Sequence, residues 1–544
     1  MVASCRVALA LVAAAPAVLG GNIQVPGLKL PEEYYEQREI VKGMFTSSYE
    51  AYKKYAWGHD DLKPVSKSYT DSRNGWGATL VDAMPTMYIM GLDDLFHEAV
   101  DYVSGVDFSE SRTDNTVSIF ESSIRYVAGL LSSYQLSGEK DDVLVEKAKQ
   151  LADKLVLGWV DGNAVPYGFV NFTTGKPVKD TTNIAEAGTL TIEYYELSKY
   201  TQNDTYVKLA EGSARQIMNT APPLPGLPAQ GYSPAHNTFV GGYVTWGGGS
   251  DSYLEYLIKY ARLTNTDDNS WADAWHTAVD SSIKHLLRRS TVGDWLYLAD
   301  YDSSKKIRHI SSHLACFHGG NWIQGGRLID NETIVNYGLE LTDACWNTYA
   351  STATGLGPEV FAFISSDGNY TTANGQISDA ELAFYNAHGF YITSADYILR
   401  PEVLESQFIA YRATGDAKYL ERAAAAVASM DAYLGVHDAF AGIEDVDDEQ
   451  SKRIDDTESF WFAEVLKYLY LIFDDPEHIS LDEYILNTEA QPFKAPPAKG
   501  TYGSGKLLDA QADASATAGG DLPVISANAF MPESINEAIG LDGA

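Results

Sequence analysis

The stretch Asp251-Ser-Tyr-Leu-Glu-Tyr-Leu-Ile-Lys-Tyr260 carries the pattern that decides the fold. Its apolar residues lie three and four positions apart, which is the spacing of residues on one face of an α-helix. A polar turn, Thr264-Asn-Thr-Asp, follows this helix, and a second helical pattern follows the turn. The unit is therefore predicted to be a helical hairpin that begins with an acidic residue.

The same unit recurs along the chain. Glu186 and Glu402 begin two further copies, and Glu121, Glu186 and Asp251 are evenly spaced in the sequence. Helical hairpins bury their apolar stripes by packing side by side. We therefore expect residues 35–492 to form a helix-dominated α/α barrel, a ring of hairpins with short β-hairpin insertions. A linear solenoid is the alternative, although solenoids usually have shorter repeats and capping units.

The charge balance excludes some classes of partner. The chain has 39 Lys and Arg residues against 74 Asp and Glu residues, a net charge of −35. Nucleic-acid binding needs a basic surface, so it is excluded, and docking on anionic membranes is disfavoured. Phe, Trp and Tyr make up 12% of the chain. Sugar rings can stack on such side chains, although most of them belong to the core.

Residues 1–20 are expected to be a signal peptide. Arg6 precedes the mostly apolar run 7–19, which is too short to span a bilayer. Cleavage could follow Ala17 or Gly20, and an uncleaved membrane anchor is the alternative. After cleavage we expect no membrane span, and a protein that is secreted or held in the lumen of the secretory pathway.

Two segments flank the expected barrel. Residues 21–34 would lead into it, and residues 493–544 are predicted to form a flexible tail without a catalytic part. The tail prediction rests on composition, because residues 495–523 are rich in Ala, Gly, Pro, Asp and Ser. No dimer seam is evident in the sequence, so we expect a monomer.

Cysteines and sequons agree with an oxidising compartment. Cys5 would leave with the signal peptide, and the remaining pair, Cys316 and Cys345, predicts one disulfide. Such a bond would contribute about 3 kcal/mol by loop entropy; two buried free thiols are the alternative. Four glycosylation sequons are present, at Asn171, Asn203, Asn331 and Asn369.

Three acidic residues stand at predicted helix starts, where a carboxylate stabilises the helix dipole. Glu121 is the fourth residue of a capping box. Asp251 follows an N-cap serine, and a proline at the first helical position precedes Glu402. Helix stabilisation alone could explain all three, and Glu186 occupies the same repeat position with no further sign of function.

The neighbours of these acids favour a ligand site. Arg125 lies one helical turn after Glu121. Arg400 lies two residues before Glu402, and the glycines at 247–249 allow a ligand to approach the backbone. Carboxylates that meet in an aromatic cavity are what glycoside hydrolysis requires, because one acid protonates the leaving oxygen and one base activates water.

Eight short motifs, in chain order, resemble those of the class I α-1,2-mannosidases, glycoside hydrolase family 47, over roughly residues 35–492. They are Asp71-Ser-Arg-Asn-Gly-Trp-Gly77, Phe120-Glu-Ser-Ser-Ile-Arg125, Asp251-Ser-Tyr-Leu-Glu-Tyr256, His313-Leu-Ala-Cys-Phe317, Gly357-Pro-Glu359, Leu399-Arg-Pro-Glu402, Glu458-Ser-Phe-Trp-Phe-Ala-Glu464 and Asn487-Thr-Glu-Ala490. The resemblance implies an (α/α)7 barrel. It also implies calcium-dependent, inverting hydrolysis of terminal α-1,2-linked mannose on high-mannose N-glycans.

The resemblance assigns roles to individual residues. Glu121 matches the proton donor, acting through a water molecule, and Glu402 matches the base that activates the attacking water. Asp251 and Glu359 match two further essential acids, whose division of labour stays open. Thr488 matches the residue that binds calcium through its carbonyl and hydroxyl oxygens.

Further residues would support the metal and the sugar. Because calcium takes six to eight oxygen ligands, most of them would be waters and sugar hydroxyls. Phe460 matches an aromatic floor beneath the mannose, with an ordinary core position as the alternative. His313 could serve structure alone beside Cys316. The candidates to hold calcium-bound waters are Glu405, Glu464 and Glu489, and those to line the site are Arg125, His313 and Arg400.

Two positions depart from the family pattern. Gln491 replaces a histidine that is common in the family and does not bind calcium. Gly249 stands where the restrictive endoplasmic-reticulum members carry an arginine. Loss of a bulky charged side chain should open the site to several branches, so we hypothesise trimming toward five mannoses.

Two other functions remain as alternatives. Another α/α-toroid exo-glycosidase, such as a glucoamylase-like enzyme, would act on α-glucans without calcium. A degradation-enhancing, mannose-binding lectin would keep the fold with weak catalysis, but the retained acids argue against it.

Overall fold

The computed structural model describes residues 21–371 and 376–508, and the predicted helical hairpins are present in these ranges. Helix α6 (Asp142–Leu155) illustrates why they form. Its buried residues include Leu144, Ala148, Leu151 and Leu155, which recur every three or four positions, and all residues of the helix outside the buried set are partly or fully exposed. Such a stripe stabilises a helix only when a neighbour covers it, so each helix requires a partner.

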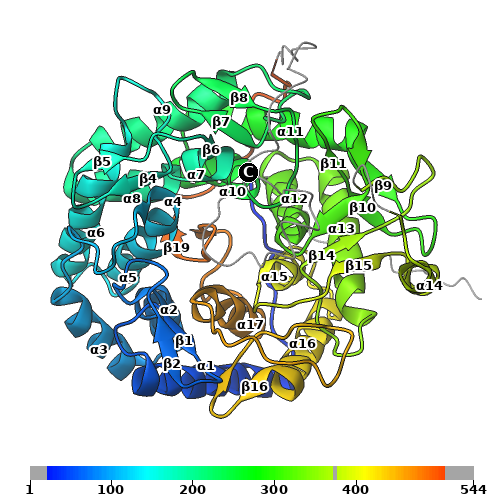
Figure 1. The fold of residues 1–544 in the computed structure, drawn as a ribbon, viewed down its shortest axis with the longest axis horizontal. Helices are drawn as coiled ribbons and strands as arrows, with labels where there is room; N and C mark the ends of the chain where they lie inside the picture. Colours follow the sequence, from blue (N-terminus) through cyan, green and yellow to red (C-terminus); the bar gives the residue numbers. More distant parts are fainter. Residues whose placement is uncertain (1–20, 372–375, 509–544) are drawn as a thin grey trace, which may run out of the picture.

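The helices form two concentric rings (Figure 1). The inner ring of the described chain consists of α2 (Ala78–Ile89), α5 (Ala128–Leu136), α8 (Thr191–Thr201), α10 (Asp251–Thr264), α12 (Phe317–Leu328), α15 (Glu402–Thr414) and α17 (Leu466–Ile472). The outer ring consists of α1 (Tyr35–Tyr55), α3 (Asp93–Ser104), α6, α9 (Thr205–Asn219), α11 (Ser270–His285), α13 (Glu332–Ala350) and α16 (Lys418–Leu434).

The ring is closed. Each inner helix packs against its neighbours on both sides, and α17 contacts α1, which begins the chain of hairpins. Helix α17 continues a π-helical turn, η5 (Trp461–Val465), and η5 packs against α2. The chain therefore forms an (α/α)7 barrel, and the linear solenoid is wrong. Helix α14 (Asp379–His388) lies outside both rings (Figure 1).

Inner helices have neighbours on every side, which requires small residues at the closest contacts. Helix α12 packs between α13 and α15, and its glycines permit this approach. A Cβ atom on Gly325 would lie 2.2 Å from the Trp275 ring, and one on Gly320 would lie 2.8 Å from Ile409. Side chains at these positions would push α12 away from α11, which carries Trp275, and from α15, which carries Ile409.

Short helical turns begin or extend several hairpins. They are η1 (Glu32–Tyr34), α4 (Ile119–Glu121), the π-helical η2 (Ser122–Val127), η3 (Val156–Gly158), α7 (Ile184–Gly188) and η4 (Leu314–Cys316). The turns α4, η2, α7 and η4 stand at the entrance to inner helices. Motif residues lie on α4, η2 and η4, and α7 carries Glu186.

Strands are short and antiparallel, as expected for insertions. Three sheets have three strands: β3 (Val117–Ser118), β4 (Phe169–Asn171) and β5 (Lys176–Pro177); β6 (Thr182–Asn183), β7 (Gly231–Ser233) and β8 (Thr238–Val240); and β13 (Ile310–Ser312), β14 (Val360–Ala362) and β15 (Tyr391–Ser394). Their first strands lead directly into α4, α7 and, after His313, η4.

Five two-stranded hairpins complete the described strands. They are β1 (Asp61–Lys63) with β2 (Ser68–Thr70), β9 (Leu287–Arg289) with β10 (Leu296–Leu298), β11 (Asp300–Tyr301) with β12 (Ile307–Arg308), β16 (Gly435–Val436) with β17 (Ala439–Phe440), and β18 (Tyr484–Leu486) with β19 (Pro492–Lys494). The β18–β19 turn, residues 487–491, is buried apart from a partly exposed Thr488. It bonds to the side chains of Glu193 and Lys467 and to the backbone carbonyl of Ile124.

The structure corrects the start of the expected tail. Phe493 is fully buried in the core, and Tyr502 is 5% exposed, with its backbone amide bonded to the Leu328 carbonyl. The carbonyl of Pro496 accepts a hydrogen bond from Arg262. Residues 493–508 thus pack on the barrel because β19 carries them onto its surface; the rest of the expected tail, 509–544, lies outside the described residues.

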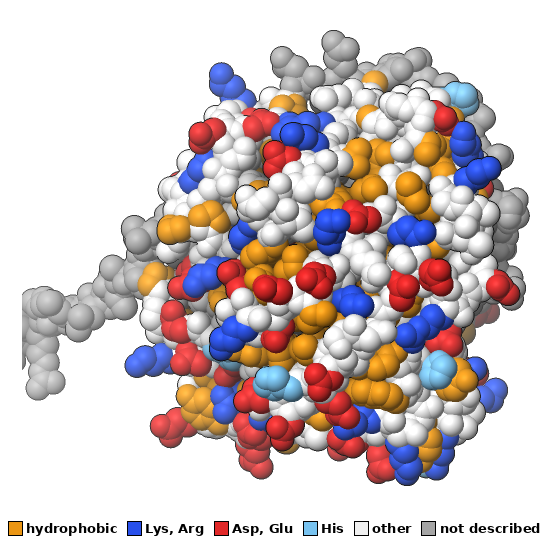
Figure 2. Space-filling model, turned by 90° about the vertical axis from the view of Figure 1, so that its left-hand side faces the viewer, with side chains coloured by type: hydrophobic (Ala, Val, Ile, Leu, Met, Phe, Trp, Pro, Cys, Tyr) orange, Lys and Arg blue, Asp and Glu red, His pale blue; other side chains and the backbone are white. Residues whose placement is uncertain are grey.

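Other sequence expectations have mixed outcomes. Cys316 and Cys345 form the predicted disulfide, which links η4 to α13 with the Cα atoms 5.9 Å apart. The expected signal peptide lies outside the described residues. Over the described ranges, no helix is both long and apolar enough to cross a membrane. On the face in Figure 2, acidic and basic side chains are intermixed.

The four sequon asparagines lie at the surface. Asn331 caps α13 by accepting hydrogen bonds from the amides of Thr333 and Ile334. Asn171, Asn203 and Asn331 are partly exposed and Asn369 is exposed. Their glycosylation stays a prediction.

Candidate active site

A solvent-open cavity lies where the inner helices begin. Its wall comes from α4, η2, α7, α10, α15 and η5 with the residues just before them, and from the β18–β19 turn. Nine predicted site residues line it: Glu121, Arg125, Asp251, Arg400, Glu402, Phe460, Glu464, Thr488 and Glu489. Three others, Glu359, His313 and Glu405, are buried behind this lining and contact it or its neighbours.

Glu121 is held at the start of its helix by the Ser118 half of the predicted capping box. Its backbone amide donates to the Ser118 hydroxyl over 3.2 Å, and Arg125 Nε donates to its carboxylate over 2.6 Å. The π-helical turn η2 carries Arg125, and such turns often occur at functional sites. Although burial disfavours a charge, Glu121 and Glu489 raise the pKa of Arg125, which therefore stays cationic.

Glu402 has a strong partner in His313. The His313 Nδ1 lies 2.7 Å from a carboxylate oxygen of Glu402, and its Nε2 lies 2.7 Å from the Tyr349 hydroxyl. Burial alone would raise the pKa of Glu402, but His313 and Arg400 lower it below its ordinary value. Glu402 is thus an ionised carboxylate suited to accept a proton. Pro401 is the N-cap of α15, one position earlier than predicted.

Asp251 occupies the same helix position with the opposite result. Ser250 is the N-cap, as predicted, but without a side-chain capping bond. Asp251 accepts a hydrogen bond from the backbone amide of Ser252 over 2.8 Å. Burial, with repulsion from Glu255 and Glu402, raises its pKa to about 7 despite that bond. Asp251 can therefore carry a proton in mildly acidic solution.

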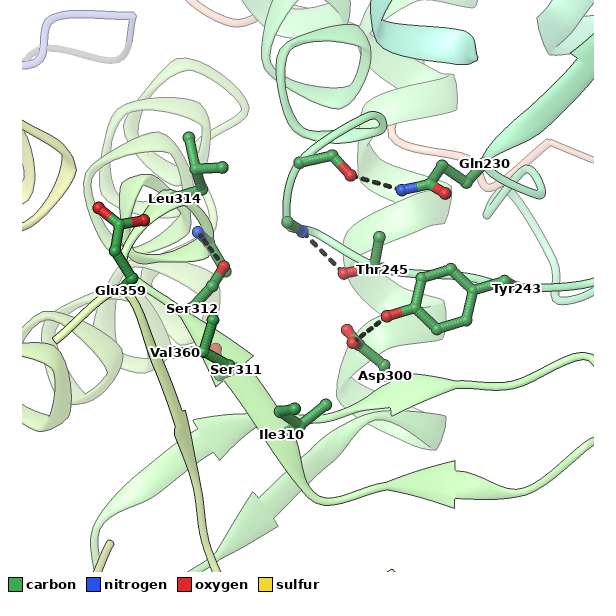
Figure 3. A pocket seen from close by; sticks show the side chains of 13 residues that line it. Gln230, Tyr243, Thr245, Asp300, Ile310, Ser311, Ser312, Leu314, Glu359 and Val360 are labelled. Carbon is green, nitrogen blue, oxygen red and sulfur yellow. Dashed lines mark hydrogen bonds between the residues drawn. The ribbon is translucent and has the colours of Figure 1, made fainter. Parts of the chain in front are cut away.

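Glu359 is separated from the cavity by its partner. Arg400 Nε donates to both of its oxygens, over 2.8 and 2.6 Å, and burial raises the pKa of Glu359 to about 8 although Arg400 opposes the shift. Figure 3 shows Glu359 beside a neighbouring pocket that Gln230 and Tyr243 also line. Glu359 thus orients Arg400, and Arg400 faces the cavity.

The cavity also contains oxygen groups that could hold a cation. Burial and repulsion from Glu489, Glu402 and Glu405 raise the pKa of Glu464 well above its ordinary value. In the described ranges, no group of three or more His, Cys, Asp or Glu side chains could hold a metal directly. A hard cation that binds Thr488 and several waters, with the carboxylates one layer further out, fits this donor set.

The model of glycosyl hydrolase family 47 matches residues 44–495. The chain belongs to this family. It is 38% identical over 477 residues to mannosyl-oligosaccharide alpha-1,2-mannosidase 1B of Emericella nidulans, covering 84% of this chain and 92% of that protein. It is 37% identical to the probable 1B enzyme of Aspergillus niger, covering 84% and 91%. The solved alpha-1,2-mannosidase from Trichoderma reesei superposes with a TM-score of 0.82 at 34% identity, covering 86% of this chain and all of that one.

Some residues of this family 47 site were not predicted. Glu186, set aside in the sequence analysis, lines the cavity. Arg73 bonds to Glu458 over 2.8 Å and lies 3.8 Å from Glu121. Lys467 Nζ donates to the Ala490 carbonyl over 2.8 Å, and burial lowers its pKa to about 7. A lysine inside the apolar run of α17 is the signal that could have revealed it.

The backbone conformation and the close packing at position 249 explain why this family 47 chain has a glycine there. Its φ of +82° lies in the left-handed region, and a Cβ atom there would lie 2.7 Å from the Gln230 side chain. Gln230 in turn donates to the Gly248 carbonyl. A larger residue at 249 would therefore need both a new backbone conformation and space that Gln230 occupies.

Proposed function

We propose that the chain removes terminal α-1,2-linked mannose from high-mannose N-glycans by calcium-dependent hydrolysis with inversion. The observation that carries the proposal is the pair of acids in one cavity, Glu402 held ionised by His313 and Glu121 held by Arg125. The names of the 34–38% identical relatives support the substrate class.

In the proposed reaction, Glu402 accepts a proton from the attacking water because its lowered pKa keeps it ionised in acid. Glu121 directs a proton through a water molecule to the leaving oxygen. Asp251, with its raised pKa, is the group that can hold and pass on a proton in the same cavity. The 7% exposed Phe460 ring would support the apolar face of the mannose.

Calcium would be held by Thr488, with its waters fixed by Glu405, Glu464 and Glu489. When bound, the ion would orient sugar hydroxyls and offset the charge of the buried acids. Arg125 contributes to this arrangement because it bonds to Glu489 as well as to Glu121.

We also infer a broad product range, ending at five mannoses, since Gly249 adds no side chain to the cavity wall. The disulfide and the four surface sequons support a secreted or lumenal protein.

The test is release of mannose from a nine-mannose N-glycan, with and without a calcium chelator. We expect chelator-sensitive release of mannose with the β-anomer formed first, and a ladder of products down to five mannoses. Release of glucose from α-glucans without calcium would instead indicate another toroid glycosidase. Glycan binding without release would indicate a lectin.

A further inference from the structure

The turn that carries Thr488 is held by buried polar groups of the inner ring. The backbone amide of Thr488 donates to the Tyr256 hydroxyl over 3.3 Å, and that hydroxyl donates to a carboxylate oxygen of Glu193. Tyr256 is 2% exposed and Glu193 is fully buried. One hydroxyl therefore links the peptide of Thr488 to a carboxylate on α8.

A second bond joins the same carboxylate to the neighbouring residue. Asn487 Nδ2 donates to Glu193 over 2.9 Å and to the Ile124 carbonyl over 3.1 Å. The other end of its amide, Oδ1, accepts from the backbone amides of Glu489 and Gln491 over 2.9 and 2.8 Å. Asn487 thereby connects the residues after Thr488 to the buried carboxylate of Glu193.

We propose that Tyr256 and Glu193 are positioning residues that set the place of Thr488 and hence the affinity of the turn for a divalent cation. They do not line the cavity, so they act through Thr488 and Asn487. The inference rests on the proposed function, because it assumes that Thr488 binds calcium. Removal of a group that holds a metal ligand in place typically lowers metal affinity by about 10–100-fold.

Helix α10 offers a matched control one turn further along. Tyr260 is also 2% exposed, and its hydroxyl donates to a carboxylate, Glu211, over 2.6 Å. This bond lies on the side of α9 and has no contact with the β18–β19 turn. Tyr256→Phe and Tyr260→Phe therefore delete the same group from the same helix, but only the first deletes a bond to Thr488.

The experiment titrates calcium chloride into the full-length, chelator-stripped protein by calorimetry and records the melting temperature of the calcium-free protein. We expect Tyr256→Phe to weaken calcium binding about tenfold and Tyr260→Phe to change it less than about twofold. Tyr256→Phe should lower the calcium-free melting temperature more than Tyr260→Phe, because it loses two hydrogen bonds whereas Tyr260→Phe loses one that is partly buried.

Glu193 provides the second comparison. Glu193→Gln keeps a carbonyl oxygen that can accept from Tyr256 and Asn487, so most of the affinity should remain. Glu193→Leu removes the acceptor and should weaken binding at least about tenfold. Wild-type affinity in both Tyr256→Phe and Glu193→Leu would overturn the inference while leaving the calcium site intact. Absence of calcium binding by the wild-type protein would instead overturn the calcium part of the proposed function.

Discussion

The cavity lining holds acids at helix starts in two different settings. Glu121 and Glu402, on α4 and α15, each bond to a basic side chain, which is Arg125 for Glu121 and His313 for Glu402. Asp251, on α10, also begins its helix, but it bonds to the amide of Ser252. The pKa is lowered for Glu402 and raised to about 7 for Asp251.

The difference shows that a helix start does not by itself set proton affinity. A helix N-terminus offers each carboxylate a similar stabilisation, about 0.3–1 kcal/mol at exposed sites. For Glu402, His313 at hydrogen-bond distance and the nearby Arg400 together outweigh the cost of burial, whereas for Asp251 the amide of Ser252 does not. Glu402 is therefore kept as an ionised base, whereas Asp251 is a group that can hold a proton.

Replacement of the proposed base should have the largest effect. Glu402→Gln should lower kcat for mannose release by about 1,000-fold, because a general base typically contributes 100- to 10,000-fold. Glu196→Gln is a control for loss of a buried inner-ring carboxylate, since Glu196 is 1% exposed and bonds to Lys199 away from the cavity. Equal rates for the two variants would contradict the role of Glu402.

Replacement of Asp251 should cause a smaller loss of activity and change the pH dependence in a specific way. Because Asp251 has a pKa of about 7, its proton is present below that pH and lost above it, so kcat/KM should decline as the pH rises through about 7. Asp251→Asn should lower the rate about 100-fold and remove this alkaline decline. An unchanged alkaline limb in Asp251→Asn would assign the proton to another group.

Removal of His313, the base that supports Glu402, should bring the pKa of Glu402 closer to that of Asp251. His313→Asn should raise the pKa of Glu402, since His313 lowers it in the wild-type protein. The acidic limb of the pH profile should then move to higher pH, so that activity is lost sooner as the solution is acidified. A pH profile with an unmoved acidic limb, measured from pH 3 to 8, would show that Glu402 does not set that limb.

The smallest effect is expected at the glycine beside Asp251. Gly249→Ala should lower the free energy of unfolding by about 1–2 kcal/mol, because a Cβ at φ +82° is strained and meets Gln230. Gly212→Ala on α9 is the control, since no atom lies within 4 Å of its added Cβ. Denaturant melts that rank the two variants equally would contradict this account.

Gly249→Arg tests whether position 249, in the cavity lining near Asp251, limits the range of glycan branches that are trimmed. The product ladder from a nine-mannose glycan should stop earlier than in the wild-type protein, and Gln230→Ala in the same chain should restore part of the lost stability by making room. An unchanged ladder in a folded double variant would refute the role of position 249 in branch choice.

Much of the fold and site could be predicted from local patterns. The helical spacing in residues 251–260, the even spacing of Glu121, Glu186 and Asp251, and the Cys316–Cys345 pair can all be found from positions in the sequence. The structure confirms the hairpins, the barrel and the disulfide. Predictions failed or fell short where long-range contacts decide. Residues 493–508 were assigned to a tail because composition cannot reveal the surface they pack against, and Glu186 was set aside because only ring closure brings α7 to the cavity.

The sequence by itself determined the helix faces, the acidic helix starts and the family motifs, since periodicity, capping and motif order are local properties of the chain. Only the tertiary structure decided which acids hold a proton. His313 and Glu402, or Glu193 and Asn487, are distant in sequence, and their bonds exist because the barrel closes and the β18–β19 turn is buried against its inner helices. Proton affinity and metal-ligand placement depend on distances of a few ångströms between such residues, and the closed ring sets those distances.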